Sequence, residues 1–291
     1  MPELPEVQTI ADDLSRSIIG RKIISVWSDL PKNKLPNLAE IRGATVRTID
    51  RRGKNILIYL SKNKDSLLLL VHPRMTGHFL LGRWMIPKSK NGKIKPAATA
   101  GPLAEKVNSY VHLVFTLSGG EMLGLSDARK FSRIVFGKAE RVEKLNELKK
   151  LGPDALSPQL TAASLKKIIL KKNRPIKAVL LDQTAVAGIG NIYSDEILWL
   201  ARISPLKTSS KLKDAEARKI YSAMRAILKK AVRLRGTSFS DFRDVSGSKG
   251  GYGEKRLIYG LAGHPCRRCG SAISKIKISG RTASFCPLCQ R

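Results

Sequence analysis

Two pairs of cysteines near the end of the chain set the strongest constraint on its fold. They form two Cys-x-x-Cys pairs separated by sixteen residues: Cys266, Cys269, Cys286 and Cys289. This spacing is typical of a zinc site in which two turns supply four thiolate ligands. Four thiolates leave no open coordination position for a reacting water. We therefore expect one structural Zn²⁺ that folds the end of the chain.

The residues between the two cysteine pairs predict a β-hairpin. Isoleucines recur among polar residues from 273 to 278, and Ser279-Gly280 supplies a turn. Arg281 would then lie at the tip of the hairpin.

The chain carries a large excess of positive charge. Its 54 Lys and Arg against 23 Asp and Glu give a formal net charge of +31. Such an excess repels itself in a folded protein, so a polyanionic partner explains it better than solubility does. Nucleic acid is the favoured partner, and a membrane surface is the weaker alternative.

No targeting or membrane-spanning segment is predicted. The sequence has no run of about 18 apolar residues, and acidic residues stand near the N-terminus, where a signal peptide would be basic and then apolar. We expect a soluble cytoplasmic protein without a membrane partner. In a reducing compartment the clustered cysteines favour a metal over disulfides.

The first half of the chain changes from a helical to a β pattern. Residues 5–18 place apolar side chains on one helical face. From about Ile23 to Gly137, short β-rich runs such as 55–60, 66–73 and 111–117 alternate with turn residues. Several strands at short spacing suggest a β-sandwich.

A stretch rich in Lys, Pro, Ala and Gly interrupts the β-rich part at 84–109. Its apolar content is too low for a core of its own, so we interpret it as a mobile surface loop. Its lysines could contact phosphates, although solvation alone is the favoured interpretation: Lys88, Lys90, Lys93 and Lys95.

The second half of the chain has a helical period. Apolar residues recur at helical spacing around 165–169 and 176–180, and a long amphipathic segment runs from Asp214 to Arg235 and stops at Gly236. A domain boundary near 140–155 follows from this change of period.

Three motifs resemble one known family. They are the opening Pro2-Glu3-Leu4-Pro5-Glu6-Val7, the stretch Ala187-Gly188-Ile189-Gly190-Asn191-Ile192-Tyr193, and Gly280-Arg281 ahead of FCPLCQ. Together they resemble formamidopyrimidine-DNA glycosylase, and the resemblance runs from residue 2 to the end, with 84–109 resembling an insertion.

The resemblance implies an α+β multidomain fold. The expected parts are an N-terminal catalytic β-sandwich domain with flanking helices (2–137), a linker (138–155), a helix-two-turn-helix domain with a lesion-recognition loop (156–262) and a four-cysteine zinc finger (263–291). The family's activity would make the protein a monomeric, bifunctional DNA glycosylase and AP lyase of base excision repair.

The implied reaction excises oxidised purines, 8-oxoguanine and formamidopyrimidines, from duplex DNA. Removal of Met1 would free the secondary amine of Pro2 to attack the sugar and form a Schiff base, with β,δ-elimination to follow. Taken alone, Pro2 is better interpreted as a helix-entry proline, and the motif reverses that preference. Glu3 would be the general acid and base, while Glu6 either holds the N-terminus or, as the simpler interpretation, faces the helix dipole.

Further residues match the family's DNA contacts. Lys54 matches the family's lysine that contacts the phosphate and the departing base. Asn191 and Arg281 match the two residues that clamp a phosphate, although Asn191 is also a candidate helix N-cap. Void-filling residues of the family match Met75, Arg129 and Phe131. His72 and, in the glycine-rich loop 246–260, Tyr252 complete the expected DNA-binding set.

The sequence leaves three alternatives. A sister branch that prefers oxidised pyrimidines typically has glycine where this chain has Leu4. A catalytically inactive damage-binding protein would not need Pro2 and Glu3. An RNA-associated zinc ribbon would explain charge and cysteines but not the N-terminal motif.

The chain departs from the family pattern at Pro73, Arg74, Ala128 and Lys130.

Overall fold

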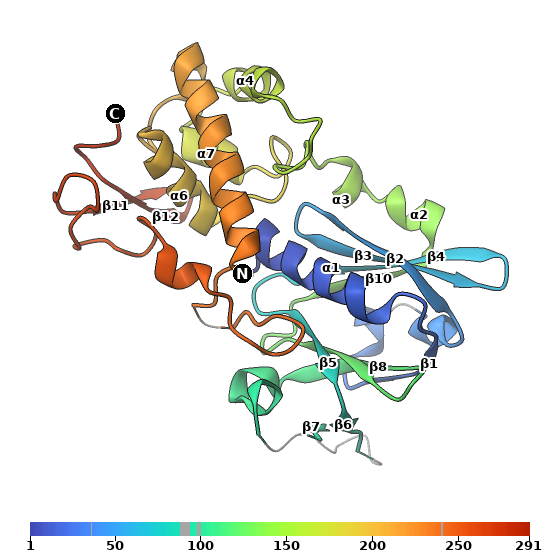
Figure 1. The fold of residues 1–291 in the computed structure, drawn as a ribbon. Helices are drawn as coiled ribbons and strands as arrows, with labels where there is room; N and C mark the ends of the chain where they lie inside the picture. Colours follow the sequence, from blue (N-terminus) through green and yellow to red (C-terminus); the bar gives the residue numbers. More distant parts are fainter. Residues whose placement is uncertain (36, 88–93, 98–99, 240) are drawn as a thin grey trace. The chain divides into compact units, whose positions relative to one another are not determined.

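The computed structural model describes residues 1–35, 37–87, 94–97, 100–239 and 241–291 (Figure 1). The chain forms two compact units. The first comprises Met1–Lys149 and Leu234–Gly251, and the second comprises Lys150–Arg233 and Tyr252–Arg291. The segment Leu234–Gly251 therefore packs with the β-rich unit, although the sequence-based boundaries group it with the helices.

Two four-stranded antiparallel sheets form the first unit. One has the order β1-β8-β9-β5 and the other β10-β4-β3-β2. The strands are β1 (Ile23–Ser28), β2 (Thr45–Arg52), β3 (Asn55–Lys62), β4 (Asp65–His72), β5 (His78–Gly82), β8 (Val111–Leu117), β9 (Met122–Ser126) and β10 (Arg133–Lys138). This confirms the predicted β-sandwich.

Helix α1 (Leu4–Ile18) packs on the core of this sandwich. Its apolar side chains recur every three or four residues, so they lie on one face and are buried with residues of both sheets: Val7, Ile10, Ala11, Leu14 and Ile18. The helix predicted over 5–18 is confirmed. The short helices α2 (Ala139–Glu143) and α3 (Asn146–Lys149) end the first part of this unit.

Two loops cross from one sheet to the other at the same edge of the sandwich. The β4–β5 loop leaves His72, which pairs with Arg133, and enters the second sheet at His78, which pairs with Ser126. The β9–β10 loop makes the reverse crossing, from Ser126 to Arg133. The register thus places the two loops side by side.

The described part of 84–109 is folded, which corrects the expectation of a surface loop. Strands β6 (Trp84–Met85) and β7 (Lys95–Pro96) pair, and the 3-10 helices η3 (Pro102–Ala104) and η4 (Lys106–Asn108) follow. Trp84 and Ile94 are buried in a small apolar cluster with strand residues. Lys95 is exposed, whereas Lys88, Lys90 and Lys93 lie outside the described residues.

The second unit is built on four helices and a hairpin. Its helices are α4 (Ala162–Leu170), α5 (Ile176–Leu181), α6 (Asn191–Ala201) and α7 (Asp214–Arg233), and β11 (Ser274–Ile278) pairs with β12 (Arg281–Phe285). The predicted helices and hairpin are confirmed. Ser279 and Gly280 both have positive φ, as a two-residue hairpin turn of type I′ requires.

The remaining short helices are of the 3-10 type: η1 (Lys32–Lys34), η2 (Leu38–Ile41), η5 (Ser209–Lys211) and η6 (Tyr252–Lys255). Among the described residues, none of the helices combines the length and the apolar character that crossing a membrane demands.

Candidate active site

The N-terminus leads directly into α1. Pro2 is buried, whereas Met1 is 44% exposed. Glu3 is the N-cap of α1: its carboxylate accepts from the Glu6 amide, and the Glu6 carboxylate accepts from the Glu3 amide at 2.8 Å. This capping box satisfies two backbone donors of the first turn and fixes the chain next to Pro2.

The second carboxylate oxygen of Glu6 binds a distant part of the chain. It accepts from the Thr237 amide at 2.7 Å. Gly236 has φ +77°, and a Cβ there would lie 2.7 Å from Glu6 Oε1. Glu6 therefore holds the N-terminus against the segment that follows α7, which is more than the helix-dipole partner that the sequence favoured.

Lys54 occupies a tight turn of the first unit. It lies with Gly53 in the two-residue connection of β2 and β3, where Arg52 pairs with Asn55. Gly53 has φ +61°, a conformation that glycine adopts without steric cost. Lys54 is 6% exposed, so its side chain is largely shielded from solvent in this turn.

His72 ends β4 and is uncharged at neutral pH. Burial first, and then the positive charges of Arg74 and Lys54, lower its pKa to about 4. The Arg74 amide donates to Nδ1 at 3.0 Å, which requires an unprotonated nitrogen. The structure thus brings His72 near Lys54, and the imidazole can offer a neutral donor through Nε2.

The three expected void-filling residues lie on the two crossing loops. Met75 is partly buried on the β4–β5 loop, and Arg129 and Phe131 are exposed on the β9–β10 loop. The Arg129 guanidinium lies 4.5 Å from the centre of the Phe131 ring, a cation–π contact. Phe131 is 51% exposed, which suits a residue that enters another surface.

Asn191 opens α6 in the second unit. The N-cap is Gly190, which makes no side-chain cap, so the expectation that Asn191 is itself the N-cap is wrong. The Asn191 Oδ1 is buried and has no hydrogen-bond partner among the described residues. A helix N-terminus with an adjacent amide side chain is a favourable place for a phosphate.

Tyr252 is an internal residue, contrary to the expected DNA contact. Its side chain is fully buried, its ring centre lies 5.5 Å from that of Tyr193, and its hydroxyl donates to Glu196 at 2.8 Å. Glu196 also accepts from the amides of Leu257, Ile258 and Tyr259. In this conformation Tyr252 positions the chain and offers no surface for a base.

The four cysteines gather as the spacing predicts. Their Sγ atoms all lie within 4.8 Å of one another. A tetrahedral Zn²⁺ with Zn–S distances of about 2.3 Å requires Sγ atoms about 3.8 Å apart, so the cluster fits one structural zinc ion. The Trp199 Nε1 lies 3.4 Å from the Cys266 Sγ and orients that ligand. Arg281, at the tip of the adjoining hairpin, is exposed.

A buried ion pair ties the finger hairpin to the helices of this unit. Lys177 and Asp195 are both fully buried and contact each other, and Asp195 also accepts from the Ser284 amide at 2.9 Å. Burial raises the pKa of Asp195 to about 6, although Lys177 opposes the shift. The pair thus connects the helix that begins at Asn191 to the strand that begins at Arg281.

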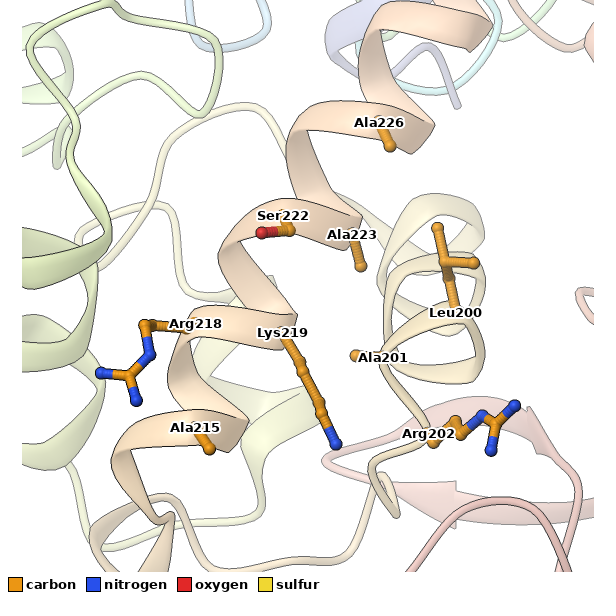
Figure 2. A pocket seen from close by; sticks show the side chains of 9 residues that line it. All are labelled: Leu200, Ala201, Arg202, Ala215, Arg218, Lys219, Ser222, Ala223 and Ala226. Atoms are coloured by element: carbon orange, nitrogen blue, oxygen red, sulfur yellow. The ribbon is translucent and has the colours of Figure 1, made fainter.

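A groove of about 700 Å³ lies between α6 and α7 (Figure 2). Small side chains such as Ala201 and Ala223 line it, and Lys219 and Arg202 bring positive charge to the end drawn lowest in Figure 2. None of the expected catalytic residues and no carboxylate lines it. It therefore lacks the groups that base excision requires.

Several supporting residues were missed by the sequence analysis. Thr237, Glu196 and the Lys177–Asp195 pair act through contacts that join distant parts of the chain. One signal was available for Lys177 and Asp195, since charged residues within otherwise apolar helical segments are seldom fully buried without a partner.

Comparison with known proteins covers most of the chain. Residues 1–134 match the formamidopyrimidine-DNA glycosylase N-terminal domain, and residues 151–243 match the H2TH domain of the same family. Residues 263–291 match a zinc finger found in FPG and IleRS. The order of the matches follows that of the predicted domains.

Full-length relatives and solved structures agree with these matches. Formamidopyrimidine-DNA glycosylase of Pelotomaculum thermopropionicum is 36% identical over 100% of this chain and 99% of its own. That of Heliobacterium modesticaldum is 35% identical over both full lengths. The MutM (Fpg) structure from Thermus thermophilus has a TM-score of 0.83 and 32% identity, over 99% of this chain and 98% of its own. A Lactococcus lactis FPG mutant in complex with Fapy-dG-containing DNA has a TM-score of 0.85 and 33% identity over both full lengths. The chain belongs to the formamidopyrimidine-DNA glycosylase family, whose members are DNA glycosylases and AP lyases.

Proposed function

We propose that the protein excises oxidised purines from duplex DNA through Pro2 and then cleaves the strand. After removal of Met1, the Pro2 nitrogen attacks the sugar C1′ and the damaged base leaves. Opening of the sugar ring gives an iminium ion that acidifies C2′, and β- and δ-elimination release the two phosphates. A secondary α-amine suits this role because its reference pKa, near 8, leaves part of it unprotonated at neutral pH.

The arrangement of Glu3 and Glu6 is the observation that carries this proposal. Glu6 binds the Glu3 amide and the Thr237 amide, so the residue after the nucleophile is fixed from two sides. Glu3 is 2% exposed, and a carboxylate shielded from water is suited to proton transfer. We assign Glu3 the protonation of the sugar ring oxygen and the later proton transfers at the opened sugar.

DNA is the partner that the charge and the relatives support. One relative, a MutM structure 33% identical to this chain, is in complex with carbocyclic 8-oxo-G-containing DNA. A Lactococcus lactis FPG mutant is in complex with Fapy-dG-containing DNA. We propose that Lys54, Asn191 and Arg281 contact the backbone phosphates and that neutral His72 donates a further hydrogen bond. A single chain carries every proposed group, so we expect it to act as a monomer.

We propose that the two crossing loops fill the void that an extruded base leaves in the duplex. Met75, Arg129 and Phe131 would enter the stack, and Arg129 would contact the orphaned base, expected to be cytosine. The exposure of Phe131 and its contact with Arg129 support this proposal.

Single-turnover excision from a duplex with 8-oxoguanine opposite cytosine tests the proposal. We expect Glu3→Gln to bind the duplex as the unaltered protein does but to excise at least about 100-fold more slowly, because a general acid and base contributes about that much. The matched control is Glu40→Gln, which alters an exposed carboxylate of the same unit. Excision by Glu3→Gln at the rate of the unaltered protein would contradict the assigned role.

A further inference from the structure

Asp127 joins the two loops that cross the sandwich edge. Its Oδ1 accepts from the Thr76 hydroxyl and, at 3.2 Å, from the Arg129 amide, and its Oδ2 accepts from the Ser132 amide at 2.7 Å. Thr76 belongs to the β4–β5 loop and the other two donors to the β9–β10 loop. One carboxylate therefore receives donors from both loops.

This carboxylate is inside the protein and charged. Asp127 is 3% exposed, and burial alone would raise its pKa, yet the three donors hold the pKa below its usual value. Hydrogen bonds to a buried charge are among the strongest in proteins. The connection between the loops is thus one that a neutral side chain would not replace.

Further contacts hold the loops at close range. The Ser132 hydroxyl donates to the Pro73 carbonyl at 3.3 Å, and the Gly77 amide donates to the same carbonyl at 3.0 Å. A Cβ on Gly77 would lie 2.2 Å from the Ser132 Oγ, so only glycine permits this approach. Each loop also contains one non-glycine residue in the left-handed region, Arg74 at φ 56° and Lys130 at φ 53°. Such conformations persist only where the surroundings impose them.

The network continues to the end of segment 84–109. His78 Nδ1 lies 3.1 Å from the Thr76 carbonyl and Nε2 lies 2.9 Å from the Asn108 Oδ1, with both side chains about 1% exposed. The Asn108 amide nitrogen donates to the carbonyls of Pro102 and Gly247. The folded part of 84–109 is thereby connected to the Thr76 loop.

We infer that Asp127 and Thr76 are positioning residues. They hold the β4–β5 and β9–β10 loops together, so that the two loops enter the base stack as one body, here called the wedge. This inference rests on the proposed void-filling role of Met75, Arg129 and Phe131. Asp127 is 3% exposed, so we assign it a role through the loops and not a contact with DNA or the reacting sugar. It fixes the β4–β5 loop relative to the β9–β10 loop, so that Met75 enters the stack together with Arg129. Asn108, from segment 84–109, anchors the two loops through His78.

The test uses Thr76→Val, which removes the hydroxyl and keeps the shape of the side chain. A duplex with a non-cleavable tetrahydrofuran abasic site, and 2-aminopurine next to it, reports wedge entry by fluorescence. We expect Thr76→Val to reduce the rate of wedge entry and the excision of 8-oxoguanine about tenfold or more. Cleavage of a single-stranded abasic oligonucleotide, which needs no wedge, should stay unchanged. Thr76→Ser keeps the hydroxyl and should show normal rates of wedge entry and of 8-oxoguanine excision.

One control and two further variants separate positioning from general stability. Ser28→Ala removes a hydroxyl that donates to the His112 carbonyl in the same sandwich, and it should leave wedge entry unchanged. Asp127→Asn, which cannot accept from both the Thr76 and Ser132 sides, should reproduce the Thr76→Val defect. Asn108→Ala should give a weaker loss, about two- to fivefold. Unchanged fluorescence with Asn108→Ala would show that segment 84–109 does not help to position the two loops.

The outcomes distinguish this inference from the proposed function. Thr76→Val with wedge entry within about twofold of the unaltered protein would overturn the inference. If the unaltered protein fails to cleave the single-stranded abasic site while Thr76→Val still slows wedge entry, the Pro2 assignment fails and the positioning role stands.

Discussion

The Glu6 carboxylate accepts a hydrogen bond of 2.7 Å from the Thr237 amide, which joins residues 231 positions apart in the chain. Because the same carboxylate binds the Glu3 amide, the segment after α7 and the N-terminus form one hydrogen-bonded site. This contact is one of those that hold Leu234–Gly251 in the same compact unit as the sandwich.

Glu6→Gln should disturb the contact between the first turn of α1 and the Glu3 amide. A glutamine can still accept from Thr237, but its amide would face the Glu3 amide, so two donors would meet. We expect a loss of about 1–3 kcal/mol in the free energy of unfolding and a slower excision step with little change in DNA affinity. Urea denaturation and single-turnover kinetics measure the two effects. A change in affinity alone would contradict a positioning role for Glu6.

Two glycines of positive φ in the first unit, Gly120 and Gly236, should differ in how well they tolerate a side chain. Gly120→Ala meets nothing within 4 Å and should cost only the backbone strain, about 1 kcal/mol. Gly236→Ala brings a Cβ to 2.7 Å from Glu6 Oε1 and should cost about 1–3 kcal/mol more. Thermal denaturation of both variants, together with excision rates, provides the comparison. Equal losses of stability would show that Gly236 does not approach Glu6 closely.

The low pKa of His72 predicts how stability depends on pH. The folded protein binds the His72 proton at about pH 4 and the unfolded chain at about 6.5. The contribution to stability is therefore full above pH 6.5 and is lost as pH falls toward 4, by up to about 1.4 kcal/mol per pH unit. NMR titration should find the imidazole neutral at pH 6, and His72→Gln should remove this part of the pH dependence. An imidazole half protonated near pH 6.5 would contradict the buried arrangement.

Removal of zinc should unfold the finger and weaken DNA binding. The structural ion holds the two turns that support β11 and β12, so a chelator should release one Zn²⁺ per chain and disorder the hairpin that carries Arg281. Metal analysis and circular dichroism before and after chelation measure this. A folded finger that contains no metal after chelation would refute the structural role.

Arg281→Ala tests the finger without disturbing the metal. Loss of one phosphate contact should weaken binding to all duplexes and reduce the slope of log affinity against log salt by about 1. Lys275→Ala is the matched control, since it removes a positive charge from the other end of the same hairpin. Equal effects of the two variants would show that general charge, not a specific contact, is responsible.

The fold was largely predictable because periodic patterns report local structure. The helix over 5–18, the strands at 55–60 and 111–117 and the hairpin around Ser279-Gly280 each depend on nearby residues. The cysteine spacing likewise predicted the four-cysteine cluster, since two Cys-x-x-Cys turns are typical of a zinc site.

The interactions between distant residues were not predictable from the sequence. Asp127 and Thr76 are 51 positions apart, and nothing local marks either as a partner of the other. Tyr252 stands among glycines and charges, which suggested a surface residue, yet Glu196 and Tyr193 bury it. The buried Trp84 was hidden in a stretch of lysines and prolines because one apolar residue produces no periodic signal.

Borohydride trapping shows whether Pro2 becomes covalently attached to the sugar of the lesion. The protein with Met1 removed is incubated with an 8-oxoguanine duplex and sodium borohydride, and the cross-linked residue is identified by mass spectrometry. We predict a reduced DNA adduct on Pro2, with none formed on a tetrahydrofuran duplex, which cannot form the iminium. Tight binding to the lesion duplex without an adduct, or an adduct on a lysine in place of Pro2, would contradict the account.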